Sequence, residues 1–211
     1  MLGFILSKMN LLILVTAMFA IIGFFSFGLA DIAKINEANL LLSQLKNMGE
    51  VVANSNSSCD TSSYFLKDAL KTGGGNFYYL IKVSKVKLTN PDGSEVNNVI
   101  FSTIPRREQD YAFAANSFRT SATVSIYGRN YVDRRYEGEY EDFCVSAETC
   151  SALADPQSSV RMNSIVFIKE RVADEDLLHI ILCPAEGCES IIDNQVETIV
   201  GRDLLCGKGL S

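Results

Sequence analysis

The sequence predicts an α+β protein: a long N-terminal helix, transmembrane in its first half and amphipathic in its second, followed by a disulfide-bonded, β-rich globular head. Three observations predict this class. Residues 9–30 carry no charge, residues 31–54 continue them with helical periodicity and no proline, and all six cysteines lie further on, among alternating apolar and polar residues. The chain therefore divides into a stub at 1–8, a span at 9–30, an amphipathic continuation at 31–54 and an extracytoplasmic head at 55–211.

The apolar run at residues 9–30 is long enough to cross a bilayer, whose hydrocarbon core needs about 20 helical residues. A soluble helix of this length would show a polar face, and this run shows none. Lys8 precedes it, which favours a cytoplasmic amino terminus and an exported head. A cleaved secretory signal is the competing interpretation, but the run exceeds a typical signal core. We expect a single-pass membrane protein with the lipid bilayer as a partner.

A stripe of apolar residues continues the helix beyond Asp31. Its members recur at steps of three and four: Ile35, Ala38, Leu41, Leu42, Leu45, Met48 and Val52. A helix from residue 9 to residue 54 is a rod of about 69 Å, more than half of which stands clear of the bilayer core. The stripe must pack on the chain's own head or on the same helix of a neighbouring copy.

The six cysteines predict a disulfide framework in an oxidising compartment, since their number is even and none lies in the apolar run. Six cysteines allow 15 pairings. We expect the two local pairs, Cys144 with Cys150 and Cys183 with Cys188, and a clasp between Cys59 and Cys206. A structural zinc site is the alternative, but the gaps within the local pairs are wider than the usual metal-binding knuckle.

The head reads as two hairpins with flanking helices. Residues 77–89 and 96–104 alternate around the turn Asn90-Pro91-Asp92-Gly93, and residues 164–172 and 177–183 are strongly apolar. Helices are expected at 63–71 and 190–205. The polar linker after the long helix contains one glycosylation sequon, Asn56-Ser57-Ser58.

Charges and tyrosines gather between residues 128 and 144. Tyrosine and arginine often anchor contacts, so one interpretation is a surface that binds a ligand or partner. Its tyrosines are Tyr127, Tyr131, Tyr136 and Tyr140. The other interpretation of this segment is an exposed hairpin whose charges compensate one another, since mixed charge is ordinary at protein surfaces. The acidic residues match no calcium-binding loop.

No residue pattern indicates catalysis. The only histidine, His179, lies in an apolar strand-like run, where a packed structural role is the usual one. Nucleophile elbows, phosphate-binding loops, dinucleotide fingerprints and metalloprotease helices are absent from the sequence. We therefore expect no enzyme, no catalytic residue, no cofactor and no metal. The net charge of −6 argues against nucleic acid as a partner.

The N-terminal quarter, MNLLILVTAMFAIIGFFSFGLADIAKINEANLLLSQL, together with the exported disulfide-bonded head, resembles the type IV pilin superfamily, including archaeal pilins and archaellins. In such filaments the helices bundle into a core and the heads form the outer surface. The resemblance implies that neighbouring helices surround the apolar half and bury the stripe. Two positions depart from the pattern: Lys8 precedes Met9 rather than a small residue, and Ile13 stands at the fifth mature position, where assembling members commonly carry glutamate.

We expect a structural, pilin-like surface protein that is anchored by its N-terminal helix and forms a homo-oligomer through it, in a filament at the cell surface. The alternative is a single-pass membrane-anchored binding module that does not polymerise and contacts an extracellular ligand through the tyrosines.

Overall fold

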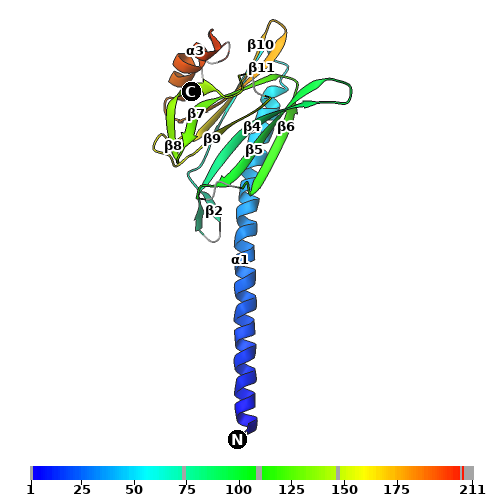
Figure 1. Ribbon diagram of the computed structural model, residues 1–211, viewed down its shortest axis with the longest axis vertical. Coiled ribbons are helices and arrows are strands. Elements are labelled where there is room, and N and C mark those ends of the chain that lie inside the picture. Colours follow the sequence, from blue (N-terminus) through cyan, green and yellow to red (C-terminus); the bar gives the residue numbers. More distant parts are fainter. Residues whose placement is uncertain (1, 73–74, 108–110, 146–147, 205, 207–211) are drawn as a thin grey trace.

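Figure 1 shows the computed structural model of the chain, in which a helical rod carries a β-rich head. The structure describes residues 2–72, 75–107, 111–145, 148–204 and 206; within the rod, the side chains of residues 2–8, 10, 24–27 and 30 lie outside this description. The N-terminus lies at the free end of the rod, and the carboxy-terminal part of the helix runs into the head.

One helix, α1 (Leu2–Ala53), forms the rod. Its 52 residues correspond to a length of about 78 Å. It contains no proline, and it ends where the backbone amides of Asn54 and Ser55 donate to the carbonyls of Glu50 and Val52. The backbone has no break at residue 8 or residue 30, where the sequence suggested boundaries.

The transmembrane part of the expected fold class is wrong. Among the residues that the structure describes, no helix is both long enough and apolar enough to cross a membrane. The expected span at 9–30 and the single-pass topology with a cytoplasmic amino terminus are therefore not supported.

Two sheets form the head. The first has the order β6-β5-β4-β9 and is antiparallel throughout. The second has the order β1-β10-β11-β7-β8, with β11 and β7 parallel. A small hairpin joins β2 and β3. The strands are β1 (Cys59–Phe65), β2 (Leu70–Thr72), β3 (Gly75–Phe77), β4 (Tyr79–Thr89), β5 (Glu95–Pro105), β6 (Ala114–Thr120), β7 (Thr123–Val132), β8 (Arg135–Asp142), β9 (Thr149–Ala154), β10 (Ser164–Val172) and β11 (Glu175–Cys183).

Both expected hairpins are confirmed. β4 and β5 pair along their whole length around a turn in which Gly93 has a φ of 83° and the backbone amide of Ser94 donates to Asp92. β10 and β11 pair in the middle of the second sheet. The helix expected at 63–71 is wrong, because residues up to Phe65 pair with β10 and residues from Leu70 form β2.

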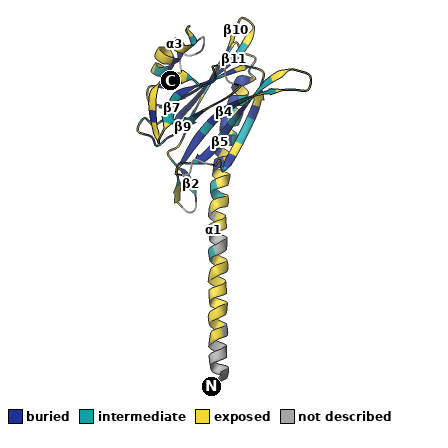
Figure 2. Cartoon of the chain, viewed as in Figure 1, coloured by how far each residue is buried: buried dark blue, intermediate teal, exposed yellow. Residues whose placement is uncertain are grey.

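The last third of α1 packs on both sheets and completes the core. It contacts β5 and β6 of the first sheet and β1 and β10 of the second. At Gly49 the helix comes so close that an added Cβ would lie 2.8 Å from the Phe118 ring and 3.1 Å from the Phe167 ring. Figure 2 shows the change from an exposed rod to a buried helix where α1 enters the head.

A second, smaller core lies on the other side of the five-stranded sheet. The segment α2 (Cys188–Ile191), η1 (Ile192–Val196) and α3 (Glu197–Val200) places Ile192 and Val196 against Val166 and Ile181. It ends at Gly201, which has a φ of 76°. Because β10 is covered on both faces, nearly all its side chains are buried, which explains its unbroken apolar run.

All three expected disulfides are present. Cys144–Cys150 closes the loop between β8 and β9, and Cys183–Cys188 joins the end of β11 to the start of α2. Cys59–Cys206 joins the start of β1 to the end of the described chain, across 147 residues. All six cysteines are therefore disulfide-bonded, and none is free.

Candidate functional site

The part of α1 that stands clear of the head (Figure 2) has a long apolar surface. Its described side chains are exposed on every side of the helix. The members are Met9, Leu11, Leu12, Ile13, Leu14, Val15, Met18, Phe19, Ile21, Ile22, Leu29 and Ile32. We call this set the apolar rod. Soluble monomers rarely expose contiguous apolar patches larger than a few hundred Å², so such a surface marks an interaction site.

The predicted stripe lies next to the apolar rod and is buried by the chain's own head. Ala38, Leu42 and Leu45 have no exposed area, Leu41 and Val52 are also buried, and Met48 is half-buried. Only Ile35 is exposed, at 41%. The implied burial of this stripe by neighbouring helices is therefore wrong, because the two sheets already occupy it.

The chain changes character where the rod meets the head. Asp31 and Lys34 form an ion pair at 2.9 Å, and the Lys34 ammonium lies 5.7 Å from the centre of the Phe77 ring. These are the first charges after the apolar run, and they separate the apolar rod from the buried stripe. Exposed ion pairs of this kind contribute little stability.

A cleft of about 630 Å³ opens at this junction, between α1 and the edge of the head. Ile35 lines it from the helix, and Phe77 and Phe113 line it from the head, with ring centres 4.9 Å apart in an edge-to-face arrangement. Exposed Tyr78 and exposed Tyr111 add aromatic surface. Sequence reasoning missed this cleft, because its walls come from four separate segments.

Two arginines line one side of the cleft, and one of them, Arg106, is held by hydrogen bonds within the head. The Arg106 guanidinium donates to the buried Asp155 carboxylate at 3.1 Å and to the Gln157 carbonyl at 3.1 Å. Arg107 is exposed, and its carbonyl accepts a hydrogen bond from Arg134. The cleft therefore offers aromatic walls and basic groups, which suit binding.

The four tyrosines expected at a contact surface mostly lie inside the head. Tyr127, Tyr136 and Tyr140 are 3%, 8% and 8% exposed, and Tyr131 is half-buried. Tyr131 donates to Asp155 at 2.8 Å, and Tyr136 donates to the Leu153 carbonyl at 2.8 Å. These two hydrogen bonds join the β7–β8 hairpin to the end of β9 and to Asp155, which follows it. The expected tyrosine contact surface is therefore wrong.

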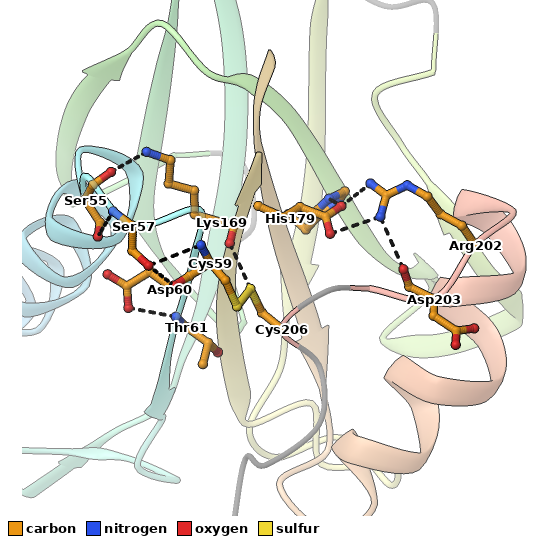
Figure 3. Close-up of a disulfide and its surroundings, with 11 residues drawn as sticks. Ser55, Ser57, Cys59, Asp60, Thr61, Lys169, His179, Arg202, Asp203 and Cys206 are labelled. Atoms are coloured by element: carbon orange, nitrogen blue, oxygen red, sulfur yellow. Dashed lines mark hydrogen bonds and ion pairs between the residues drawn. A yellow bond between two sulfur atoms is a disulfide. The ribbon is translucent and has the colours of Figure 1, made fainter. Parts of the chain in front are cut away.

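A buried polar network surrounds His179 (Figure 3). His179 Nε2 lies 2.9 Å from the carboxylate of Glu170, and Nδ1 lies 3.1 Å from the Tyr127 hydroxyl. Arg202 donates through both terminal nitrogens to Glu170, whose side chain has no exposed area. The carboxylate favours the proton on Nε2, so that Nδ1 accepts from Tyr127.

This network holds the C-terminal segment onto the second sheet. Burial raises the pKa of Tyr127 to about 12 from its ordinary value of 10.0. Since His179 is 4% exposed, a substrate cannot reach its ring. The histidine therefore lies in a packed structural setting.

Among the described residues, no group of His, Cys, Asp and Glu is arranged to hold a metal ion.

Comparison of the chain with family models, with curated proteins and with solved structures finds no match. The pilin resemblance therefore remains a hypothesis drawn from the sequence.

Proposed function

We propose that the chain is a structural, pilin-like subunit whose copies assemble through the apolar rod of α1. The observation that carries this proposal is the rod itself: its described side chains are apolar and exposed on every side. A helix that is apolar all round is normally buried all round, which a single neighbour does not achieve. Several neighbouring rods would bury it, as in the core of a filament.

The division of α1 into two parts supports the same proposal. The stripe from Ala38 to Val52 serves the core of the head, so it leaves the apolar rod free for association between copies. No charged residue interrupts 9–30, and rods can therefore pack without desolvating a charge. Three disulfides support assembly in an oxidising, extracytoplasmic setting.

The test compares two triple lysine variants of the full chain. Leu11, Met18 and Ile22 lie on one side of the helix at spacings of seven and four, and each is at least 59% exposed. Burying three such side chains contributes about 2 kcal/mol each, or roughly a 10⁴-fold change in association. We expect L11K/M18K/I22K to disperse assemblies seen by electron microscopy and analytical ultracentrifugation.

The matched control carries the same three charges on the head. Phe65, Val132 and Val145 are apolar residues that are 58%, 50% and 68% exposed. F65K/V132K/V145K should assemble like the wild type. Wild-type protein that stays monomeric after dilution from mild detergent, or a head variant that disperses as completely as the rod variant, would contradict the proposal.

A second candidate function, ligand binding, is favoured by the cleft at the junction. Its volume of about 630 Å³ lies in the range of small-molecule sites, and its aromatic walls adjoin a basic residue. Ligand-observed NMR with anionic aromatic compounds, on wild-type protein and on a Tyr78→Ser/Arg107→Glu variant, tests it. A compound that binds the wild type and loses binding in this variant supports a binding module. If no compound behaves in this way, ligand binding is rejected and only the structural role remains.

A further inference from the structure

The loop that joins α1 to β1 is fixed at several points. The Ser57 hydroxyl donates to the Cys59 carbonyl at 2.6 Å and accepts from the Cys59 amide at 3.2 Å. The Arg171 amide donates to the Ser58 carbonyl at 2.9 Å, and the ammonium of Lys169 donates to the Ser55 carbonyl. Figure 3 shows this loop beside the Cys59–Cys206 disulfide. The loop therefore has a defined surface position.

Asn56 lies in the middle of this loop, and its side chain takes no part in the contacts that fix the loop. It is exposed, and within the described part of the chain its amide makes no hydrogen bond. Ser58, two residues later, is also exposed. Asn56-Ser57-Ser58 is the only Asn-x-Ser/Thr triplet in the sequence. Elsewhere an asparagine can be committed to the fold, as at Asn163, whose side chain accepts from the Ala185 amide.

We propose that Asn56 is the acceptor of an N-linked glycan. The side-chain nitrogen of Asn56 forms a bond to the anomeric carbon of a lipid-phosphate-linked oligosaccharide. The bond between that carbon and the phosphate oxygen breaks, the lipid phosphate leaves with the electron pair, and the amide loses one proton to a base of the transferase. Such transfer takes place in exported compartments, where the three disulfides also belong.

The folded head accommodates the product without rearrangement. An exposed asparagine with no partner gives up no hydrogen bond when its nitrogen is substituted, whereas a buried one would have to leave the core. The loop follows the carboxy-terminal end of α1, at the end of the molecule opposite the N-terminus in Figure 1. A glycan there stays clear of the apolar rod, so this inference does not depend on the proposed assembly.

Intact-mass spectrometry and glycopeptide mapping of the full chain test the proposal. The chain is expressed in a host that glycosylates exported asparagines, and its disulfide-bonded fraction is analysed. We expect the wild type to carry a glycan mass that is lost completely in Asn56→Gln and in Ser58→Ala. Ser58→Thr keeps the sequon and should keep the glycan.

The matched control is Asn54→Gln, two residues earlier. Asn54 is also exposed, but the residue two positions after it is Asn56 rather than serine or threonine. This variant should retain the glycan. An unmodified Asn56 peptide in the disulfide-bonded wild type, in cells that glycosylate a co-expressed reporter, overturns the proposal. A glycan mass that survives Asn56→Gln does the same.

Discussion

Replacing Gly49 by alanine should destabilise the protein, although the same change stabilises most exposed helices. At an exposed helical position, alanine is favoured over glycine by about 1 kcal/mol. At Gly49, the new methyl group would lie 2.8 Å from the Phe118 ring and 3.1 Å from the Phe167 ring, where real contacts need about 3.4 Å or more. Overpacking of this kind costs about 1–3 kcal/mol. We therefore expect a net loss of about 1 kcal/mol for Gly49→Ala, and about 3 kcal/mol for Gly49→Leu.

Urea denaturation followed by circular dichroism measures these losses, with a fall in melting temperature of about 2–4 °C per kcal/mol as a second readout. A double-mutant cycle with Phe118→Leu isolates the cause, because shortening the side chain removes the nearest contact. In that background Gly49→Ala should be neutral or stabilising. A stabilising effect of Gly49→Ala in the wild type, or the same loss in both backgrounds, would refute the close approach of α1 to the two rings.

Two further predictions concern the head. Replacing Cys59 and Cys206 by serine should lower the free energy of unfolding by about 5 kcal/mol, because the pair spans 147 residues. Replacing Cys183 and Cys188, which span 5 residues, should lower it by about 2 kcal/mol. Equal losses in urea denaturation would contradict this order. Burial raises the pKa of Tyr127 to about 12 from 10.0, so the unfolded chain releases this proton at a lower pH than the folded chain does. The contribution of Tyr127 to the free energy of unfolding is therefore fully present below pH 10 and falls by about 1.4 kcal/mol per pH unit between pH 10 and 12. Tyr127→Phe should show a correspondingly shallower alkaline loss in denaturation at each pH, and an unchanged slope would rule out that contribution.

The sequence predicts the local features of the head well. The cysteine pairs at 144–150 and 183–188 were accessible because each spans a short turn, and the apolar strands at 164–172 and 177–183 carried their own hairpin signal. The helical tail expected at 190–205 is shorter and starts earlier, because the structure has it from Cys188 to Val200 and it ends at Gly201. These features depend mainly on neighbours in the sequence.

Features that depend on distant contacts were predicted poorly. The segment 63–71 has a helix-like pattern, but pairing with β10 draws its first residues into a strand. Tyr136 and Tyr140 alternate with charges, a pattern that also fits a half-buried strand with its aromatic residues inside, and the structure has this arrangement. The cleft required four segments to meet, which no local pattern reveals.

The position of the Cys59–Cys206 bond decides how the molecule responds to tension. A pull on the rod enters the head through α1 and reaches Cys59 six residues after the helix ends at Ala53. From there the load passes through the sulfur atoms to Cys206, bypassing the sheets between them. The bridge thus withholds 147 residues from extension, a contour length of about 500 Å. A subunit loaded between its two ends would yield by drawing the helix out of the head, while the strands remain within a closed covalent ring.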